Sequence, residues 1–252
     1  MALQQTAAHL KSFIATQYDS VSRSWHPSVA ELIGVTVPWL DGPWLEPFNG
    51  QHARQQLFRS LVATVDPYAV FESGSYRGAS TRFFWQSSGK PVYTAEKNQN
   101  FARYVGRRFR HVPEVRVVNR DSREALRLLH DGNHLPHSEC IVFYLDAHWN
   151  EDLPLREEVE FITRTWPSSV IVIDDFKVPD DGGYGFDVYG SVELSLEYLG
   201  AEAIGPYQVL WPSCRSEDET GYRRGCVVLT SPKTAPALAE LPELRGGPGT
   251  TG

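Results

Sequence analysis

The strongest constraint on the fold is a regular alternation of short strand-like runs and longer helical segments that begins near Pro67. Several runs are apolar on both faces, as central strands of a parallel sheet must be when helices cover both sides. The predicted strands are 68–72, 92–96, 115–119, 141–146 and 170–174. The predicted helices are 79–87, 98–109, 122–131, 155–165 and 191–199. Two later runs, 207–211 and 226–230, are expected to close the sheet as an antiparallel pair.

This order predicts an α/β fold, a Rossmann-like and mostly parallel sheet of seven strands with helices on both faces. The length of 252 residues suits one such domain, which we expect over residues 66–232. Residues 1–65 join an amphipathic stretch to an aromatic, proline-rich passage and are expected to form a helical cap or lid. Residues 233–252 are predicted to be a flexible tail.

The charge balance argues against binding to nucleic acid or anionic lipid through bulk charge. The chain has 24 Lys and Arg residues against 31 Asp and Glu residues, a formal net charge of −7. No window approaches the roughly 18 consecutive apolar residues of a membrane span. The segment MALQQTAAHLKSF lacks the apolar block of a signal peptide, so we expect a cytoplasmic protein. The first amphipathic stretch fits packing within one subunit or against a second copy of the chain, so the sequence is compatible with a homodimer.

Acidic residues recur where the predicted strands end. They are Glu72, Glu96, Asp146 and the adjacent pair Asp174 and Asp175. Open α/β sheets bind ligands outside the carboxyl ends of their strands, where the strand order reverses. These carboxylates are therefore expected to converge on one site.

The first of these acids opens the loop E-S-G-S-Y-R-G. Gly74 and Gly78 permit a tight turn and a close backbone approach between the first strand and the following helix. The loop lacks the full dinucleotide pattern G-x-G-x-x-G. A carboxylate before the glycine repels a pyrophosphate but accepts hydrogen bonds from an ammonium group. The loop therefore favours a positively charged ligand moiety.

Two further positions fit a nucleoside. Glu96 ends the second strand, where a carboxylate can accept both hydroxyls of a ribose. Asp121 and Ser122 follow the third strand and can reach an adenine ring, although either can instead be a helix N-cap before REALRLL.

Over residues 67–230 this arrangement resembles the class I S-adenosylmethionine-dependent methyltransferases. In that family the first loop holds the methionine part of the cofactor, an acid after the second strand holds the ribose, and the next loop frames adenine. The resemblance implies an S-adenosylmethionine site formed by Glu72, Gly74, Ser75, Gly78, Ser80, Glu96, Asp121, Ser122 and Asp146.

A second cluster follows the fourth and fifth strands, in L-D-A-H-W and I-D-D-F. Asp146, Asp174 and Asp175 supply hard oxygen ligands suited to Mg²⁺ or Ca²⁺. The pattern is similar to that of metal-dependent O-methyltransferases of the catechol and macrolide-sugar types. These enzymes place one Asp after the fourth strand and an Asp-Asp or Asp-Asn pair after the fifth. The alternative is that Asp146 alone is functional and the pair caps a loop.

Other side chains near this cluster are candidates for catalysis or substrate contact. With Asp146, His148 is a candidate catalytic residue as a general base; it can equally be a metal ligand or a loop histidine bonded to a carbonyl. Trp149 is a candidate substrate platform. The Gly- and Asp-rich segment 177–190 suits a mobile substrate loop with Tyr184 and Tyr189 as contacts.

The sequence thus predicts transfer of a methyl group from S-adenosylmethionine to a hydroxyl of a small molecule, a specialised metabolite or sugar, with a divalent cation, Mg²⁺, assisting. One alternative keeps the cofactor but cleaves or cyclises it at the aminopropyl side, under an aromatic lid containing Trp25, Trp39 and Trp44. Another is a non-catalytic nucleotide-binding protein with the same fold.

Overall fold

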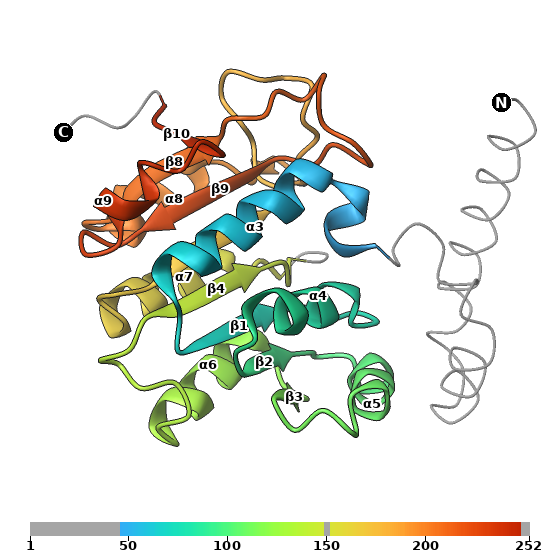
Figure 1. The fold of residues 1–252 in the computed structure, drawn as a ribbon. Coiled ribbons are helices and arrows are strands. Elements are labelled where there is room, and N and C mark those ends of the chain that lie inside the picture. The colour runs from blue at the N-terminus through green and yellow to red at the C-terminus, as the bar shows by residue number, and fades with distance from the viewer. Residues whose placement is uncertain (1–45, 149–151, 248–252) are drawn as a thin grey trace, which may run out of the picture.

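The structure is a computed structural model and describes residues 46–148 and 152–247. Its centre is a sheet of eight strands in the order β10-β8-β9-β5-β4-β1-β2-β3 (Figure 1). Five strands are parallel: β1 (Ala69–Ser73), β2 (Val92–Ala95), β3 (Val115–Val118), β4 (Ile141–Leu145) and β5 (Val170–Asp174). Three more extend the sheet through antiparallel pairings: β8 (Gln208–Pro212), β9 (Cys226–Thr230) and β10 (Leu244–Arg245).

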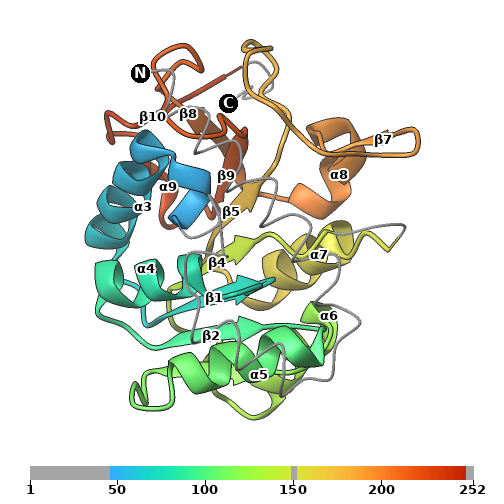
Figure 2. The same ribbon diagram turned by 90° about the vertical axis from the view of Figure 1, so that its right-hand side faces the viewer.

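Helices cover both faces of this sheet, and Figure 2 shows the two layers. One face carries α3 (His52–Val65), α4 (Ala79–Ser88), α5 (Gln99–Arg108) and the short α9 (Ala235–Leu238). The other face carries α6 (Ser122–Asp131), α7 (Leu155–Thr165) and α8 (Leu196–Ile204). Within the described part of the chain, no helix has both the length and the apolar character that crossing a bilayer requires.

The strands form where apolar side chains meet both layers. In β5, Val170 and Val172 pack into the core under α3 and α4, while Ile171 and Ile173 pack into the core under α6 and α7. Side chains of successive strand residues point to opposite faces. Asp174, the last residue of β5, therefore continues the row of Val170 and Val172 toward α3.

The predicted α/β fold with a mostly parallel sheet is confirmed, with one strand more than expected. The eighth strand is β10, which pairs Leu244 and Arg245 with Pro212 and Trp211 of β8. It lies within the segment 233–252 that the sequence predicts to be a flexible tail. Because α9 buries Ala235 and Leu238, that segment is packed on the sheet at least as far as residue 245.

The predicted cap over residues 1–65 lies mostly outside the described residues, and so do Trp25, Trp39, Trp44 and Trp149. The described part begins with a 3₁₀ turn, η2 (Pro47–Gly50), followed by α3. Leu57, Phe58 and Leu61 of α3 are buried in the same core as the strands. Helix α3 is thus part of the helical layer that covers one face of the sheet.

The helix predicted at 191–199 is displaced toward the C-terminus. Two-residue strands β6 (Val188–Tyr189) and β7 (Val192–Glu193) instead form a hairpin there, with Gly190 at φ +62°. Helix α8 starts only after Ser195, whose hydroxyl accepts a hydrogen bond from the Tyr198 N–H at 3.4 Å. A tight turn therefore forms at the start of the segment that the sequence predicts to be helical.

Gly74, directly after β1, is required by a close backbone contact. Its φ is +84°, and a Cβ placed there would lie 2.6 Å from the carbonyl oxygen of Asp146. The Asp146 N–H in turn donates to the Ser73 carbonyl and hydroxyl oxygens, each at 3.1 Å. The loop after β1 is thereby held against the end of β4.

We predict that Gly74→Ala lowers the free energy of unfolding by about 2–5 kcal/mol, because the left-handed backbone and the steric clash both add to the cost. Gly89→Ala is the matched control. Gly89 has a φ of +64° but no atom within 4 Å of its added Cβ, so only about 1 kcal/mol is expected. Urea unfolding measures both variants, and equal losses would contradict the steric argument.

Candidate functional site

The candidate site lies at the carboxyl edge of the sheet, where the strand order reverses. From β1 the chain proceeds to β2 and β3 on one side, whereas β4 and β5 lie on the other. Ligands of open α/β sheets bind at this switch point. The loop containing Gly74 and the end of β4 at Asp146 form its two sides.

Glu72, the predicted ligand of the ammonium group, is 1% exposed at this edge. Its carboxylate accepts hydrogen bonds from the hydroxyls of Ser80 and Thr81 in the first turn of α4, the latter at 2.5 Å. Burial raises its pKa, and these hydrogen bonds oppose the rise. Glu72 and Ser80 thus hold the start of α4 to the end of β1, while Gly78 begins that helix in the left-handed conformation.

Glu96 links the loop after β1 to the end of β2. Its carboxylate accepts the Tyr76 N–H at 2.9 Å and the Asn98 N–H at 2.7 Å, and Ser75 is buried beside it. Burial raises the pKa of Glu96 to about 7. A carboxylate has about four acceptor positions, so two remain for a ligand.

Asp121 is the N-cap of α6. Its side chain accepts the Arg123 N–H at 3.0 Å and pairs with the Arg123 guanidinium at 2.9 Å. These hydrogen bonds lower the pKa of Asp121. Ser122 is the first helical residue and is buried. Of the two candidate caps, the structure therefore uses Asp121, and contact of either residue with adenine stays a prediction.

Asp174 does not join the predicted cluster of three aspartates. It is 3% exposed and forms a buried ion pair with Arg54 of α3. It also accepts the Tyr144 hydroxyl and the N–H of Asp175. The reason is its position in β5, which turns its side chain toward α3. In the described structure Asp174 is engaged by Arg54 and Tyr144, and its predicted role as a metal ligand stays a prediction.

Asp175 turns back toward the switch point. It has a φ of +52°, a left-handed conformation that is uncommon outside glycine. Its carboxylate accepts the Arg224 Nε–H at 2.5 Å, and Arg224 also pairs with Asp187. Burial, and then the charge of Asp174, raise the pKa of Asp175 to about 7.

Asp146 and His148 lie beside Asp175. His148 Nε2 is 3.8 Å from Asp146 Oδ1, and one ligand atom from each of the three residues lies within 4.8 Å of the others. Burial raises the pKa of Asp146 well above its ordinary value, and so do the charges of Asp174 and Asp175. The Asp146 side chain nevertheless keeps 37% exposure, so a ligand can reach it.

His148 is 2% exposed, and no hydrogen bond from the described residues reaches either ring nitrogen. Burial lowers its pKa to about 4. Of the possibilities that the sequence left open, a ring nitrogen bonded to a carbonyl does not occur in the described structure. The imidazole is neutral near pH 7 and has a lone pair available.

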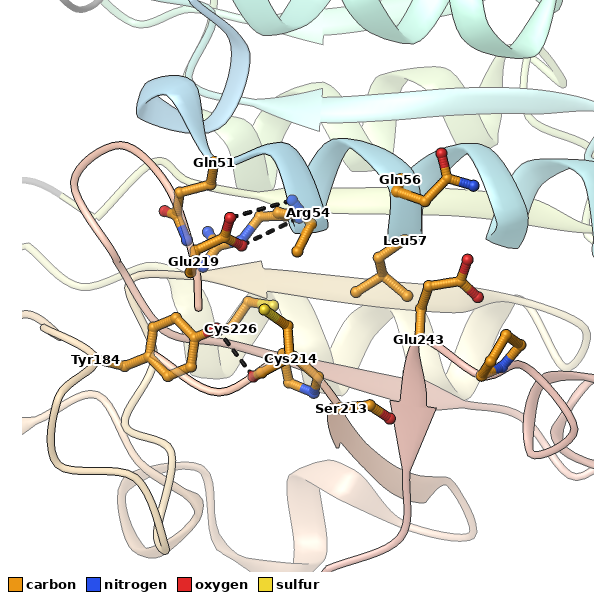
Figure 3. A pocket seen from close by; sticks show the side chains of 13 residues that line it. Gln51, Arg54, Gln56, Leu57, Tyr184, Ser213, Cys214, Glu219, Cys226 and Glu243 are labelled. Atoms are coloured by element: carbon orange, nitrogen blue, oxygen red, sulfur yellow. Dashed lines mark hydrogen bonds between the residues drawn. The ribbon is translucent and has the colours of Figure 1, made fainter. Parts of the chain in front are cut away.

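The two predicted substrate contacts, Tyr184 and Tyr189, lie in different surroundings. The Tyr189 hydroxyl donates to the His148 carbonyl oxygen and to Asp187, so it lies beside the three-residue cluster. The Tyr184 hydroxyl donates to the Cys214 carbonyl oxygen at 3.0 Å. Tyr184 instead lines a pocket of about 210 Å³ between α3 and the ends of β8 and β9 (Figure 3). That pocket is lined by Arg54 but by neither Asp146 nor His148.

Three charged residues that shape the edge were not among the predicted site residues. Arg54 and Glu158 each lie on the apolar face of an amphipathic helix, three or four residues from buried side chains such as Leu57 and Ile162. A lone charge on such a face is a signal that the sequence does contain. Arg224 has no such signal, because its partners lie 49 and 37 residues away in the chain.

Glu158 lies in the first turn of α7 and is 1% exposed. Its carboxyl group lies beside the hydroxyls of Ser122 and Ser73, behind the loop after β1. Burial raises the pKa of Glu158 to about 7. The neutral form of Glu158 is therefore favoured up to a higher pH than in an exposed glutamate.

No family model and no curated protein matches the chain. Among solved structures, a protein from Nostoc punctiforme assigned as an O-methyltransferase matches with a TM-score of 0.50 at 11% identity, covering 71% of this chain and 56% of that one. The chain has an O-methyltransferase fold. The O-methyltransferase of Bacillus cereus, solved in complex with S-adenosylhomocysteine, has a TM-score of 0.49 at 14% identity, covering 71% and 81% of the two chains. One fold can host many functions, so the chemistry of this protein depends on the residues of its site.

We predict that Glu158→Gln stabilises the protein at pH 8 by about 3 kcal/mol but has little effect at pH 4. The folded pKa lies near 7, above the ordinary value of 4.5, so the folded state holds the proton more tightly. Stability contributed by this group is complete below pH 4.5 and is lost as the pH rises through 7. Urea unfolding across pH 4–8 tests this, with the exposed neighbour Glu157→Gln as control. Parallel pH profiles of variant and wild type would contradict it.

We predict that Arg54→Leu costs about 3–5 kcal/mol of stability, because Asp174 is left as a buried charge without its partner. Adding Asp174→Asn should recover part of that loss, which a double-mutant cycle measures. Arg59→Leu, on the exposed side of the same helix, should change stability by less than about 1 kcal/mol. Additive losses in the cycle would show that the ion pair is not the cause.

Proposed function

We propose that this protein transfers a methyl group from S-adenosylmethionine to a hydroxyl oxygen of a small molecule, with help from a divalent cation. The observation that supports this most strongly is the loop after β1. Gly74 lies against the backbone of Asp146, and the Tyr76 N–H binds Glu96. One loop thereby joins the ends of β1, β2 and β4 around the switch point.

The groups at this edge match the parts of the cofactor. Glu96 keeps acceptor positions for the two ribose hydroxyls, and it is held in place by the two backbone N–H groups that it accepts. The concentration of carboxylates at the edge suits a sulfonium and an ammonium better than a phosphate. Asp121 and Ser122 at the start of α6 border the place where adenine would lie.

In this reaction the methyl group passes directly from one substrate to the other, so the protein need not form a covalent intermediate. The acceptor oxygen attacks the methyl carbon, the carbon–sulfur bond breaks, and S-adenosylhomocysteine leaves as a neutral thioether. The hydroxyl proton must pass to a base, and Asp146 is the exposed carboxylate beside the loop that holds the cofactor. Positioning of the two substrates in line accounts for much of the rate. A divalent cation at the ends of β4 and β5 would supply Lewis acidity to the acceptor hydroxyl.

A small-molecule acceptor is the reading that the charge of the chain favours. The formal net charge of −7 and the acidic edge repel a nucleic acid backbone. The partly exposed Asp146 and the nearby Tyr189 offer polar contacts of the kind that orient a hydroxylated compound.

We predict micromolar binding of S-adenosylmethionine and S-adenosylhomocysteine to the purified protein by isothermal titration calorimetry. Glu96→Gln should weaken both at least about tenfold, since one acceptor oxygen becomes a donor. Asp146→Ala should abolish turnover and weaken cofactor binding less than Glu96→Gln does. Glu139→Gln, which changes an exposed acid just before β4 and so at the opposite end of that strand from Asp146, serves as the control.

Product analysis over a panel of hydroxylated compounds then identifies the reaction. S-adenosylhomocysteine formed in step with a methylated acceptor supports the proposal, whereas methylthioadenosine indicates cleavage at the aminopropyl side. If neither S-adenosylmethionine nor S-adenosylhomocysteine binds, the proposed methyltransferase function of this protein is rejected.

A further inference from the structure

The cluster formed by Asp146, His148 and Asp175 has the geometry of a cation site. Their ligand atoms lie within 4.8 Å of one another. Donors bound to one ion at about 2.1 Å are separated by no more than about 4.2 Å, so the three groups need to close by less than about 1 Å. The separation of 3.8 Å between His148 Nε2 and Asp146 Oδ1 already falls inside that limit.

The buried imidazole is an independent indication of a ligand. His148 is 2% exposed, and neither ring nitrogen has a hydrogen-bond partner within the described residues. Leaving a buried polar group unpaired costs about 1–3 kcal/mol. A cation between His148 and the two carboxylates would remove this cost.

The fourth candidate ligand is excluded by its own contacts. Both oxygens of Asp174 are engaged, one by Arg54 and the Asp175 N–H, the other by the Tyr144 hydroxyl. Its side chain is only 4% exposed. The pair after β5 therefore divides: Asp174 binds the protein interior, and Asp175 faces the cluster.

The surrounding charge also favours a dication. Among the described residues, Asp146, Asp175, Asp187 and the nearby Asp174 and Glu72 outnumber the guanidinium groups that pair with them, those of Arg54 and Arg224. Arg224 binds Asp175 through a single oxygen, Oδ1. The second oxygen of that carboxylate is left for a metal ion, so Arg224 and the metal can share the group.

We propose that Asp146, His148 and Asp175 form a site for a first-row transition-metal dication, such as Mn²⁺, Co²⁺ or Zn²⁺, in preference to Mg²⁺ or Ca²⁺. The reason is the donor set. Carboxylates suit Mg²⁺, Ca²⁺ and Mn²⁺, whereas imidazole suits the transition metals and is a poor ligand for Mg²⁺ and Ca²⁺. This inference deepens the proposed function and rests on it for the role of the metal, while the site itself is tested by binding alone.

The deciding experiment uses the full chain, stripped of metal with EDTA and titrated with Mn²⁺ without cofactor or acceptor. Electron spin echo modulation of bound Mn²⁺ should contain a nitrogen coupling from the imidazole. Mg²⁺ or Ca²⁺ in about tenfold excess should leave most of the Mn²⁺ in place. Absence of tight Mn²⁺ binding, absence of the nitrogen coupling, or displacement by that excess of Mg²⁺ would each overturn the inference.

Two substitutions separate this site from the three-aspartate alternative. His148→Ala should remove the nitrogen coupling and weaken Mn²⁺ binding at least about tenfold. His130→Ala, which changes an exposed histidine beside Asp131, is the matched control and should alter neither. If His148→Ala fails to fold, the nitrogen coupling in the wild-type protein still decides the question, since an all-carboxylate site has none.

Failure of this inference and failure of the proposed function give different results. Methyl transfer by a protein that shows no nitrogen coupling to bound Mn²⁺ keeps the function and rejects the site. Nitrogen-coupled Mn²⁺ without binding of S-adenosylmethionine keeps the site and rejects the function.

Discussion

The ion pair between Arg54 and Asp174 is the interaction on which the arrangement of the sheet edge depends. Two charges removed from water are tolerated only when their remaining donors and acceptors are satisfied. Here Arg54 also donates to the Arg224 carbonyl oxygen, and Asp174 accepts the Tyr144 hydroxyl. The pair therefore joins α3, β4, β5 and the approach to β9 at a single buried point. The ion pair thereby fixes α3 against one face of the sheet.

This interaction also determines what is left for chemistry. The side chain of Asp174 points to α3, whereas that of the next residue points to the switch point. Asp175 reaches this direction with a left-handed backbone, at a φ of +52°. The strain of this left-handed residue is of the kind that persists where the surroundings over-determine the backbone. The resulting site contains one imidazole and two carboxylates, which is chemically different from three carboxylates. Local backbone geometry thus changes which ions the edge suits.

The sequence was informative wherever local pattern decides structure. The sequence predicts these strand ends to within one residue because the runs are apolar on both faces, and Glu72, Glu96 and Asp146 lie at one edge as expected. It was uninformative where side-chain direction depends on distant contacts. Nothing local shows that Asp174 binds Arg54, which is 120 residues away. The contacts of Arg224 likewise depend on how β9 pairs with β5.

That pairing has a consequence for how mutations act on the site. Cys226 lies opposite Asp174 in the antiparallel register of β9 and β5, and Arg224 lies just before it. A slip of one residue would turn every side chain of β9 to the opposite face and withdraw the guanidinium from Asp175 and Asp187. Apolar residues such as Val228, which hold this alignment from within the core, are thus remote determinants of the electrostatic potential at the sheet edge. Repacking them offers a way to tune the site without replacing any residue that lines it.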